Sequence, residues 1–370
     1  MSIAELRETL SAAHQKHLDP AAPLPARMMA AKGVLPLPPR EMLVVLCGLT
    51  SDATSDVAEA AKASLGKVPD KLIAGALESG LPPAALTVLA PLLVGRDELV
   101  EQLVLRKETP DEAFIAIAPT APERIVEIVA ANQERCLRSA ALVHAIRLNP
   151  HLLHSSRDRL FDFLVRAGVI YDDIPEFADA MARLSPTEIA EAAERVALPP
   201  EAAALIQVSA DDDEKAQVAA AALESPNGEA KERVPMLKLI ASLGVSQRVA
   251  LAVKGNKEAR SILLRDMNRV VASAAIRNPR LTEQEVIAAA QSRQICDEVI
   301  RIIAGSKELS RSYGAKAALV NNPKTPLPTA MRLLSLLREA DVRAVAKSKN
   351  VSMAVVNQAR RIISQKKIGS

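Results

Sequence analysis

Three histidines come nearest, by type and spacing, to a metal site. His151 and His154 form the sequence HLLH, close to the spacing of metal ligands, and His144 lies one heptad upstream. A site would need further Asp, Glu or Cys ligands, and only Asp158 and Asp162 are near in the sequence. We therefore interpret the histidines as structural or exposed residues, and predict no metal site and no cofactor.

Two other stretches have the composition of ligand-binding segments. Three aspartates at 211–213 could bind a divalent cation weakly, but a run of carboxylates is far more often a solvated linker. GNKEAR at 255–260 begins with a Gly-Asn turn ahead of a helix start. With Lys254, Lys257 and Arg260 close by, this turn could hold a phosphate. Related turns recur later in the chain, so we favour a structural role for this one.

Motifs of catalytic sites are missing from the sequence. It contains no GxxxxGK[ST], GxGxxG, GxSxG or HExxH pattern. The chain is therefore predicted not to be an enzyme.

The stronger functional signal is the distribution of charge. Residues 231–370 contain 26 Lys and Arg and 10 Asp and Glu, a net charge of +16, whereas residues 1–230 have a net charge of −13. If equivalent positions of successive repeats stack, these cations form a stripe along one face. The candidate partner-binding residues are Arg277, Arg280, Lys316, Lys324, Lys347, Lys349, Arg360, Arg361, Lys366 and Lys367.

Three interpretations of this basic face remain open. It could bind an acidic protein surface, including that of a second copy of the chain; it could bind nucleic acid or anionic lipid without sequence specificity; or it could pair with the acidic half of the same chain. Tyr313 is the only aromatic residue of the basic part, so base stacking cannot supply much affinity. We favour a protein partner, with nucleic acid as the alternative.

The segments that carry these charges have apolar residues at the three- and four-residue spacing of helices. Examples are EVIAAAQ at 285–291 and DEVIRIIAG at 297–305, and aromatic residues make up only 2% of the chain. Small aliphatic residues with few glycines favour helices. The predicted fold class is all-α.

Two kinds of corner alternate between these helices. Asn-Pro occurs at 149, 278 and 322, and the second kind reads GNKEA, GSKEL and KSKNV. Their recurrence at roughly 40 to 50 residues predicts a right-handed helical-repeat solenoid of HEAT or armadillo type.

Local chemistry predicts how the helices begin and end. Thr109, Ser185 and Thr282 are predicted N-caps, the first two followed by proline at the first helical position. In ALVNNPKTPLPTA, Asn322 is expected to end one helix in a left-handed conformation and Thr325 to cap the next.

Three stretches of the sequence resemble known helical repeats. RNPRLTEQEV, LVNNPKTPLPTAMRLL and VRAVAKSKNVSMAVV are similar to leucine-rich-repeat-variant and HEAT-like units. Residues 236–367 resemble a family of uncharacterised bacterial proteins that share GNKEARSILLRD, NNPKTPLPTA and KSKNV in this order. Residues 108–152 resemble the N-terminal repeats of the same proteins, so the resemblance covers about two-thirds of the chain. The first corner, Asn149-Pro150 followed by His151, departs from the pattern. The resemblance implies a helical-repeat fold and lends no activity.

Composition shifts predict three segments. They are an acidic helical-repeat domain at 1–208, an acidic and Ala-rich linker at 209–235, and a basic helical-repeat domain at 236–370. The three cysteines form no CxxC pair, the start MSIAELRETL has no signal-peptide pattern, and the apolar run at 42–49 is too short to span a bilayer. We therefore expect a cytoplasmic scaffold or adaptor protein.

Overall fold

The chain folds into α-helices joined by short turns. The computed structural model describes residues 3–206 and 229–368, and these ranges contain no β-strand. The predicted all-α class is therefore confirmed. In the same ranges, the helices are all too short or too polar to span a membrane.

Two compact units make up the chain, residues 1–160 and 161–370. The division falls within α12 (His154–Arg166) and does not coincide with the predicted linker at 209–235. Most of that linker lies outside the described residues, and its end belongs to α17 (Glu229–Ser242).

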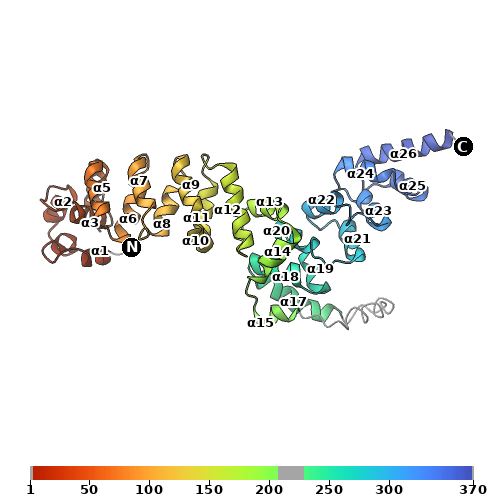
Figure 1. Ribbon diagram of the computed structural model, residues 1–370, viewed down its shortest axis with the longest axis horizontal. Helices are drawn as coiled ribbons and strands as arrows, with labels where there is room; N and C mark the ends of the chain where they lie inside the picture. Colours follow the sequence, from red (N-terminus) through yellow and green to blue (C-terminus); the bar gives the residue numbers. More distant parts are fainter. Residues whose placement is uncertain (1–2, 207–228, 369–370) are drawn as a thin grey trace. The chain divides into compact units, whose positions relative to one another are not determined.

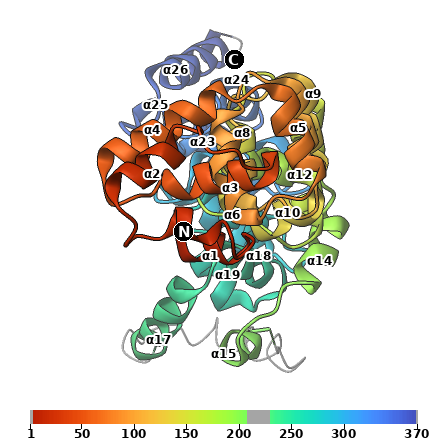
Figure 2. The same ribbon diagram turned by 90° about the vertical axis from the view of Figure 1, so that its left-hand side faces the viewer.

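The first unit is built from helices that need their neighbours for stability, because isolated helices of this length are marginal in water. Each helix packs on others close in sequence: α3 on α5, α5 on α7, α7 on α9, and α9 on α11. Helices α5, α7 and α9 lie side by side (Figures 1 and 2). The elements are α1 (Ile3–Glu8), η1 (Gln15–Leu18), α2 (Leu24–Ala31), α3 (Pro39–Leu49), α4 (Ser55–Lys67), α5 (Asp70–Glu78), α6 (Pro83–Leu89), η2 (Ala90–Leu92), α7 (Asp97–Val104), α8 (Asp111–Ile117), α9 (Glu123–Ala131), α10 (Gln133–Arg138) and α11 (Ala140–Arg147).

The second unit repeats this manner of packing. Helix α18 contacts α20, α20 contacts α22, α21 contacts α23, and α24 contacts α26. Its elements after α12 are α13 (Glu176–Arg183), α14 (Pro186–Glu194), α15 (Pro200–Ala204), α17, α18 (Val245–Lys254), α19 (Lys257–Leu263), α20 (Arg269–Ile276), α21 (Glu283–Gln291), α22 (Asp297–Gly305), α23 (Tyr313–Asn321), α24 (Leu327–Leu334), α25 (Glu339–Lys347) and α26 (Met353–Ile368).

Helices on both sides of the predicted linker pack together in this second unit. Helix α14 contacts α18, and α13 contacts α20. Ser246 accepts a hydrogen bond from the backbone N–H of Ile170 at 2.8 Å, and Lys254 donates to the carbonyl of Ala193 at 2.9 Å. The last helices of the acidic part and the first helices of the basic part therefore share one packed unit.

Buried asparagines form the Asn-Pro corners. Asn278 donates from its amide to the carbonyls of Ala252 and Val253, each at 2.8 Å, and accepts from the backbone N–H of Arg280 at 2.8 Å. Asn149 and Asn322 make the same set of bonds: each amide donates to two carbonyls about 30 residues upstream, and each side-chain oxygen accepts from the N–H two residues on. Each corner asparagine thus links its own turn by hydrogen bonds to an earlier part of the chain.

The expected left-handed conformation at these asparagines is wrong. Asn322 is extended, with φ −92° and ψ 121°, and among the described non-glycine residues a positive φ is confined to Asp173. With this extended backbone, the Asn322 amide donates to carbonyls at the end of an earlier helix. The expectation of a left-handed conformation considered only how Asn322 ends its own helix, and did not include these bonds.

Two of the predicted helix starts are confirmed and two differ. Ser185 and Thr282 each form a capping box with a glutamate three residues later. Thr109 and Thr325 instead donate their hydroxyls backwards, to the carbonyls of Leu103 at 2.7 Å and Leu319 at 2.6 Å. The prolines that follow them take the N-cap positions of α8 and α24. Both threonines are buried, so their hydroxyls satisfy orphan carbonyls and not orphan N–H groups.

The second kind of corner also has a shared local geometry. The side chains of Asn256 and Ser306 each accept a hydrogen bond from the N–H three residues on, at 2.9 and 3.3 Å. Ser348 accepts from the N–H of Asn350 at 3.2 Å. A polar side chain that closes the turn therefore stands at the same place in all three corners.

Candidate functional site

The GNKEAR turn uses its arginine inside the fold. The Arg260 guanidinium donates to both carboxylate oxygens of Glu285, each at 3.1 Å, and to the carbonyl of Gly255 at 3.1 Å. Both side chains of the ion pair are buried. Each of the three guanidinium nitrogens donates within the fold, which supports the structural role that the recurrence of the turn favours.

Glu285 is held in its charged form. Burial by itself would raise its pKa, but the hydrogen bonds from Arg260 and from Thr282 favour the carboxylate and bring the pKa below its usual range. The Thr282 backbone N–H and hydroxyl each donate to Glu285 at 2.8 Å. One carboxylate thus joins a helix cap to an ion pair.

The histidines are spread over two helices and the turn between them, with His154 at the start of α12. His144 lies in α11 and is half-buried, whereas His151 and His154 are exposed. Glu127, the nearest carboxylate in contact with this corner, bonds to the backbone N–H of Leu153 and the hydroxyl of Ser156. Among the residues that the structure describes, no three His, Cys, Asp or Glu side chains are grouped so that they could hold a metal.

Two of the ten candidate basic residues are tied into the fold. Arg277 donates to the carbonyl of Met181, and burial lowers its pKa, with Glu298 opposing the shift. Lys324 donates to the carbonyl of Ile295 at 2.6 Å and lies 3.3 Å from Asp297. These two cations are therefore the least suited of the set to contact a partner.

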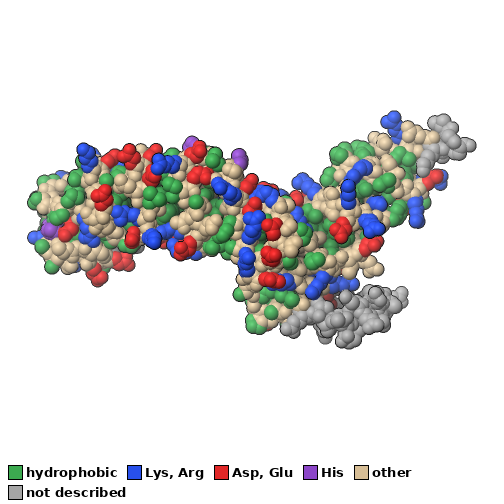
Figure 3. All heavy atoms as spheres, viewed as in Figure 1, with side chains coloured by type: hydrophobic (Ala, Val, Ile, Leu, Met, Phe, Trp, Pro, Cys, Tyr) green, Lys and Arg blue, Asp and Glu red, His purple; other side chains and the backbone are tan. Residues whose placement is uncertain are grey.

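The other candidates are more accessible. Arg280 is exposed at the Asn278 corner, and Lys316 is half-buried in α23. Lysine and arginine side chains predominate over acidic ones on the face of α22–α26 seen in Figure 3. Lys347, Lys349, Arg360 and Arg361 are all exposed on or beside the last two helices. The side chains of Lys366 and Lys367 lie outside the described residues.

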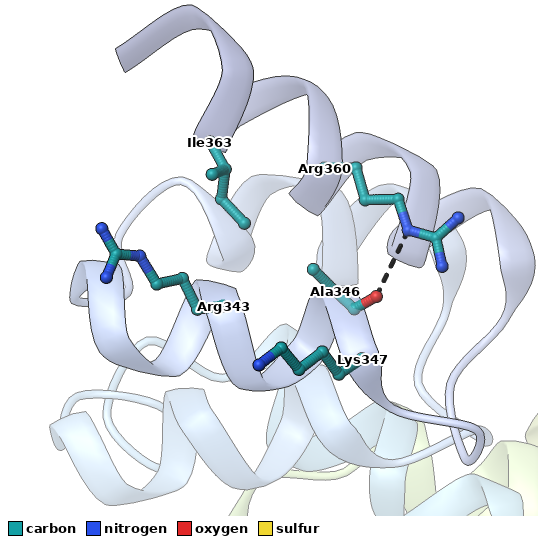
Figure 4. A pocket seen from close by; sticks show the side chains of 5 residues that line it. All are labelled: Arg343, Ala346, Lys347, Arg360 and Ile363. Atoms are coloured by element: carbon teal, nitrogen blue, oxygen red, sulfur yellow. Dashed lines mark hydrogen bonds between the residues drawn. The ribbon is translucent and has the colours of Figure 1, made fainter. Parts of the chain in front are cut away.

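A surface hollow lies between α25 and α26. Its lining residues are Arg343, Ala346, Lys347, Arg360 and Ile363. Figure 4 shows the guanidinium groups of Arg343 and Arg360 on opposite sides, with the apolar side chains of Ala346 and Ile363 between them. The Lys347 ammonium points to the Arg343 side. The hollow thus combines an apolar floor with positive charge on two sides.

Bonds within the protein leave these cations with free donors. Arg360 uses only its Nε, which donates to the carbonyl of Ala346 at 3.3 Å. Arg343 pairs with Glu339 one turn earlier in α25, and both side chains are about half exposed, so this pair contributes little to stability. A ligand carboxylate can therefore replace Glu339 at small cost.

Sequence reasoning selected Lys347 and Arg360 but missed the apolar residues beside them. Ile363 follows Arg360 by three residues, and Lys347 follows Arg343 by four, so each pair shares a helix face. That spacing was a visible signal. Which faces of α25 and α26 meet depends on their packing, which the spacing alone does not give.

Compared with known proteins, the chain matches no family model, no curated protein and no solved structure. The resemblance to a bacterial repeat family stays a prediction.

Proposed function

We propose that the chain is a helical-repeat solenoid of HEAT or armadillo type that acts as a non-enzymatic cytoplasmic scaffold or adaptor. Packing of each helix on close neighbours, together with the repeated asparagine corners, supports the solenoid. Such arrays bind other macromolecules through extended surfaces.

The observation that carries the binding proposal is the unneutralised charge at the C-terminal end. Residues 342–370 contain seven Lys and Arg and no Asp or Glu. Five of these cations, Arg343, Lys347, Lys349, Arg360 and Arg361, are exposed on or beside α25 and α26. An acidic protein surface is the partner whose charge complements this end.

Protein is favoured over nucleic acid because of the state of Tyr313. Its ring lies under the Arg338 guanidinium, 4.7 Å from the ring centroid, and its hydroxyl bonds to Asp341. One face of the only aromatic side chain in the basic part is therefore covered by Arg338, which makes the ring a poor platform for stacking on a base.

Affinity capture with the full chain tests this function. We expect a protein retained from native cytoplasm at physiological salt, and its loss when Arg360 and Arg361 are replaced by Glu. The nucleic-acid alternative predicts binding to bare oligonucleotides with a log affinity that falls steeply with log salt. Such binding, with no protein retained, would replace the proposal by the alternative.

A further inference from the structure

We propose that the hollow between α25 and α26 is a docking site for a short acidic peptide segment in which carboxylates flank a single apolar side chain. This inference rests on the proposed function and specifies the partner's contact. The apolar side chain packs on Ala346 and Ile363, and the carboxylates bind Arg343 and Lys347 on one side and Arg360 on the other.

The arrangement of the lining determines this ligand. The guanidinium groups of Arg343 and Arg360 stand on opposite sides of the hollow (Figure 4), so a ligand with two separate anionic groups complements them better than a single phosphate. Separate carboxylates on a peptide can reach both sides, and guanidinium binds carboxylate through two parallel N–H donors. The NH1 and NH2 groups of Arg360 have no hydrogen bond within the described structure, since only its Nε is used.

The apolar floor distinguishes a peptide from a polyanion. Ile363 is half-buried, and Ala346 is 8% exposed, so a small apolar surface lies between the cations. A nucleic-acid backbone has only the short CH and CH2 groups of its sugars, and no branched aliphatic side chain, to place there. An aliphatic side chain such as leucine removes that surface from water, which adds affinity that salt does not screen.

The charge of the surroundings favours the same ligand. Glu339 is the only acidic residue bonded to the cations of the hollow in the described structure, and it pairs with Arg343 through an exposed contact. Three cations and one carboxylate leave a local charge of about +2 to be neutralised, which two ligand carboxylates supply.

The test uses the full chain and a fluorescent peptide with leucine between two Glu-Asp pairs, measured by anisotropy. We expect saturable binding to the wild-type chain, and a roughly five- to ten-fold weaker affinity for Lys347→Gln/Arg360→Gln. A matched control, Lys307→Gln/Arg311→Gln, removes the same charge from exposed positions away from the hollow and should leave the affinity within two-fold.

The apolar contact is tested without changing the protein. A peptide in which serine replaces the leucine should bind several-fold more weakly, and Ile363→Ser should abolish that difference between the two peptides. Circular dichroism checks that each variant keeps its helices.

Four results would overturn the inference. They are no binding of the leucine peptide, equal losses in the two double variants, equal affinity for the leucine and serine peptides, and equal competition by an oligonucleotide of the same net charge. If a cellular protein is captured equally by the wild type and by Lys347→Gln/Arg360→Gln, but is lost when Arg360 and Arg361 are replaced by Glu, the scaffold function stands and the docking site does not. If the peptide binds as described but no cellular protein is captured, the docking site stands and the scaffold function does not.

Discussion

The Arg260 guanidinium and the Glu285 carboxylate face each other in a parallel pair of hydrogen bonds, both 3.1 Å long, with side chains only 6% and 7% exposed. The two residues are 25 positions apart and belong to α19 and α21. A pair with this degree of burial adds little net stability, but breaking it leaves a charge without a partner.

Replacing Arg260 by Ala should therefore destabilise the protein strongly. The change leaves the Glu285 carboxylate buried without its cation, and we expect a loss of about 3–5 kcal/mol in the free energy of unfolding. Urea denaturation followed by circular dichroism measures it. Arg265→Ala, at an exposed position of the same unit, is the control and should change the stability by less than about 0.5 kcal/mol. Similar losses in the two variants would contradict the role of the buried pair.

The same carboxylate gives the stability a defined pH dependence. Because folding lowers the pKa of Glu285, its contribution is fully present above the ordinary pKa of 4.5 and is lost as the pH falls through the lower folded value. Glu285→Gln should remove this component, so its stability should fall less steeply below pH 4.5 than that of the wild type. Parallel curves for the two proteins between neutral and acid pH would show that Glu285 does not contribute.

Replacing a corner asparagine should lower the free energy of unfolding, because several hydrogen bonds are lost at once. Asn322→Ala leaves the carbonyls of Ala290 and Ser292 and the N–H of Lys324 without that partner, so we expect a loss of about 2–4 kcal/mol. The adjacent Asn321→Ala is a matched control, because Asn321 is exposed and its amide bonds only to Ala317 in its own helix. Thermal unfolding of both variants should show a large shift for Asn322 and a small one for Asn321.

Glycines of the second corner type should differ in their tolerance of a side chain. A Cβ on Gly255 would collide with the carbonyl oxygen of Leu251, so Gly255→Ala should destabilise the protein by about 1–3 kcal/mol. A Cβ on Gly305, at the related corner, meets no atom within 4 Å. Gly305→Ala should therefore be neutral or stabilising by up to about 1 kcal/mol, since alanine is the better helix former. Chemical denaturation compares the two, and equal effects would show that the close approach at Gly255 is relieved by small movements.

Features encoded within a few residues could be predicted from the sequence. The all-α class follows from helical spacing of small apolar residues, and the capping boxes at Ser185 and Thr282 follow from a hydroxyl and a glutamate three positions apart. The roles of Asn322 and Thr325 could not be predicted in this way. The carbonyls that Asn322 bonds are set by packing, and the helix after Thr325 starts one residue later than expected, so that Pro326 takes the N-cap position.

The hollow could not be predicted for the same reason, because it depends on how two helices pack against each other. Lys347 and Arg360 stood out as cations in a stretch without acidic residues. Their common hollow exists because α25 and α26 pack against each other, which also places Ile363 beside Ala346. Arg277 and Lys324 look equivalent to them in the sequence. Their side chains, however, donate to the carbonyl of Met181 in α13 and to that of Ile295 in the turn before α22.

The asparagine corners also determine where the chain can come apart. Asn322 follows α23 but satisfies carbonyls at the end of α21, so opening the segment that contains it exposes polar groups on a helix that is still folded. Fraying from the C-terminal end therefore meets an extra cost at Asn322 and again at Asn278. We therefore expect local unfolding to involve α24, α25 and α26 as a group, because the carbonyls bonded by Asn322 stay paired when these three helices open.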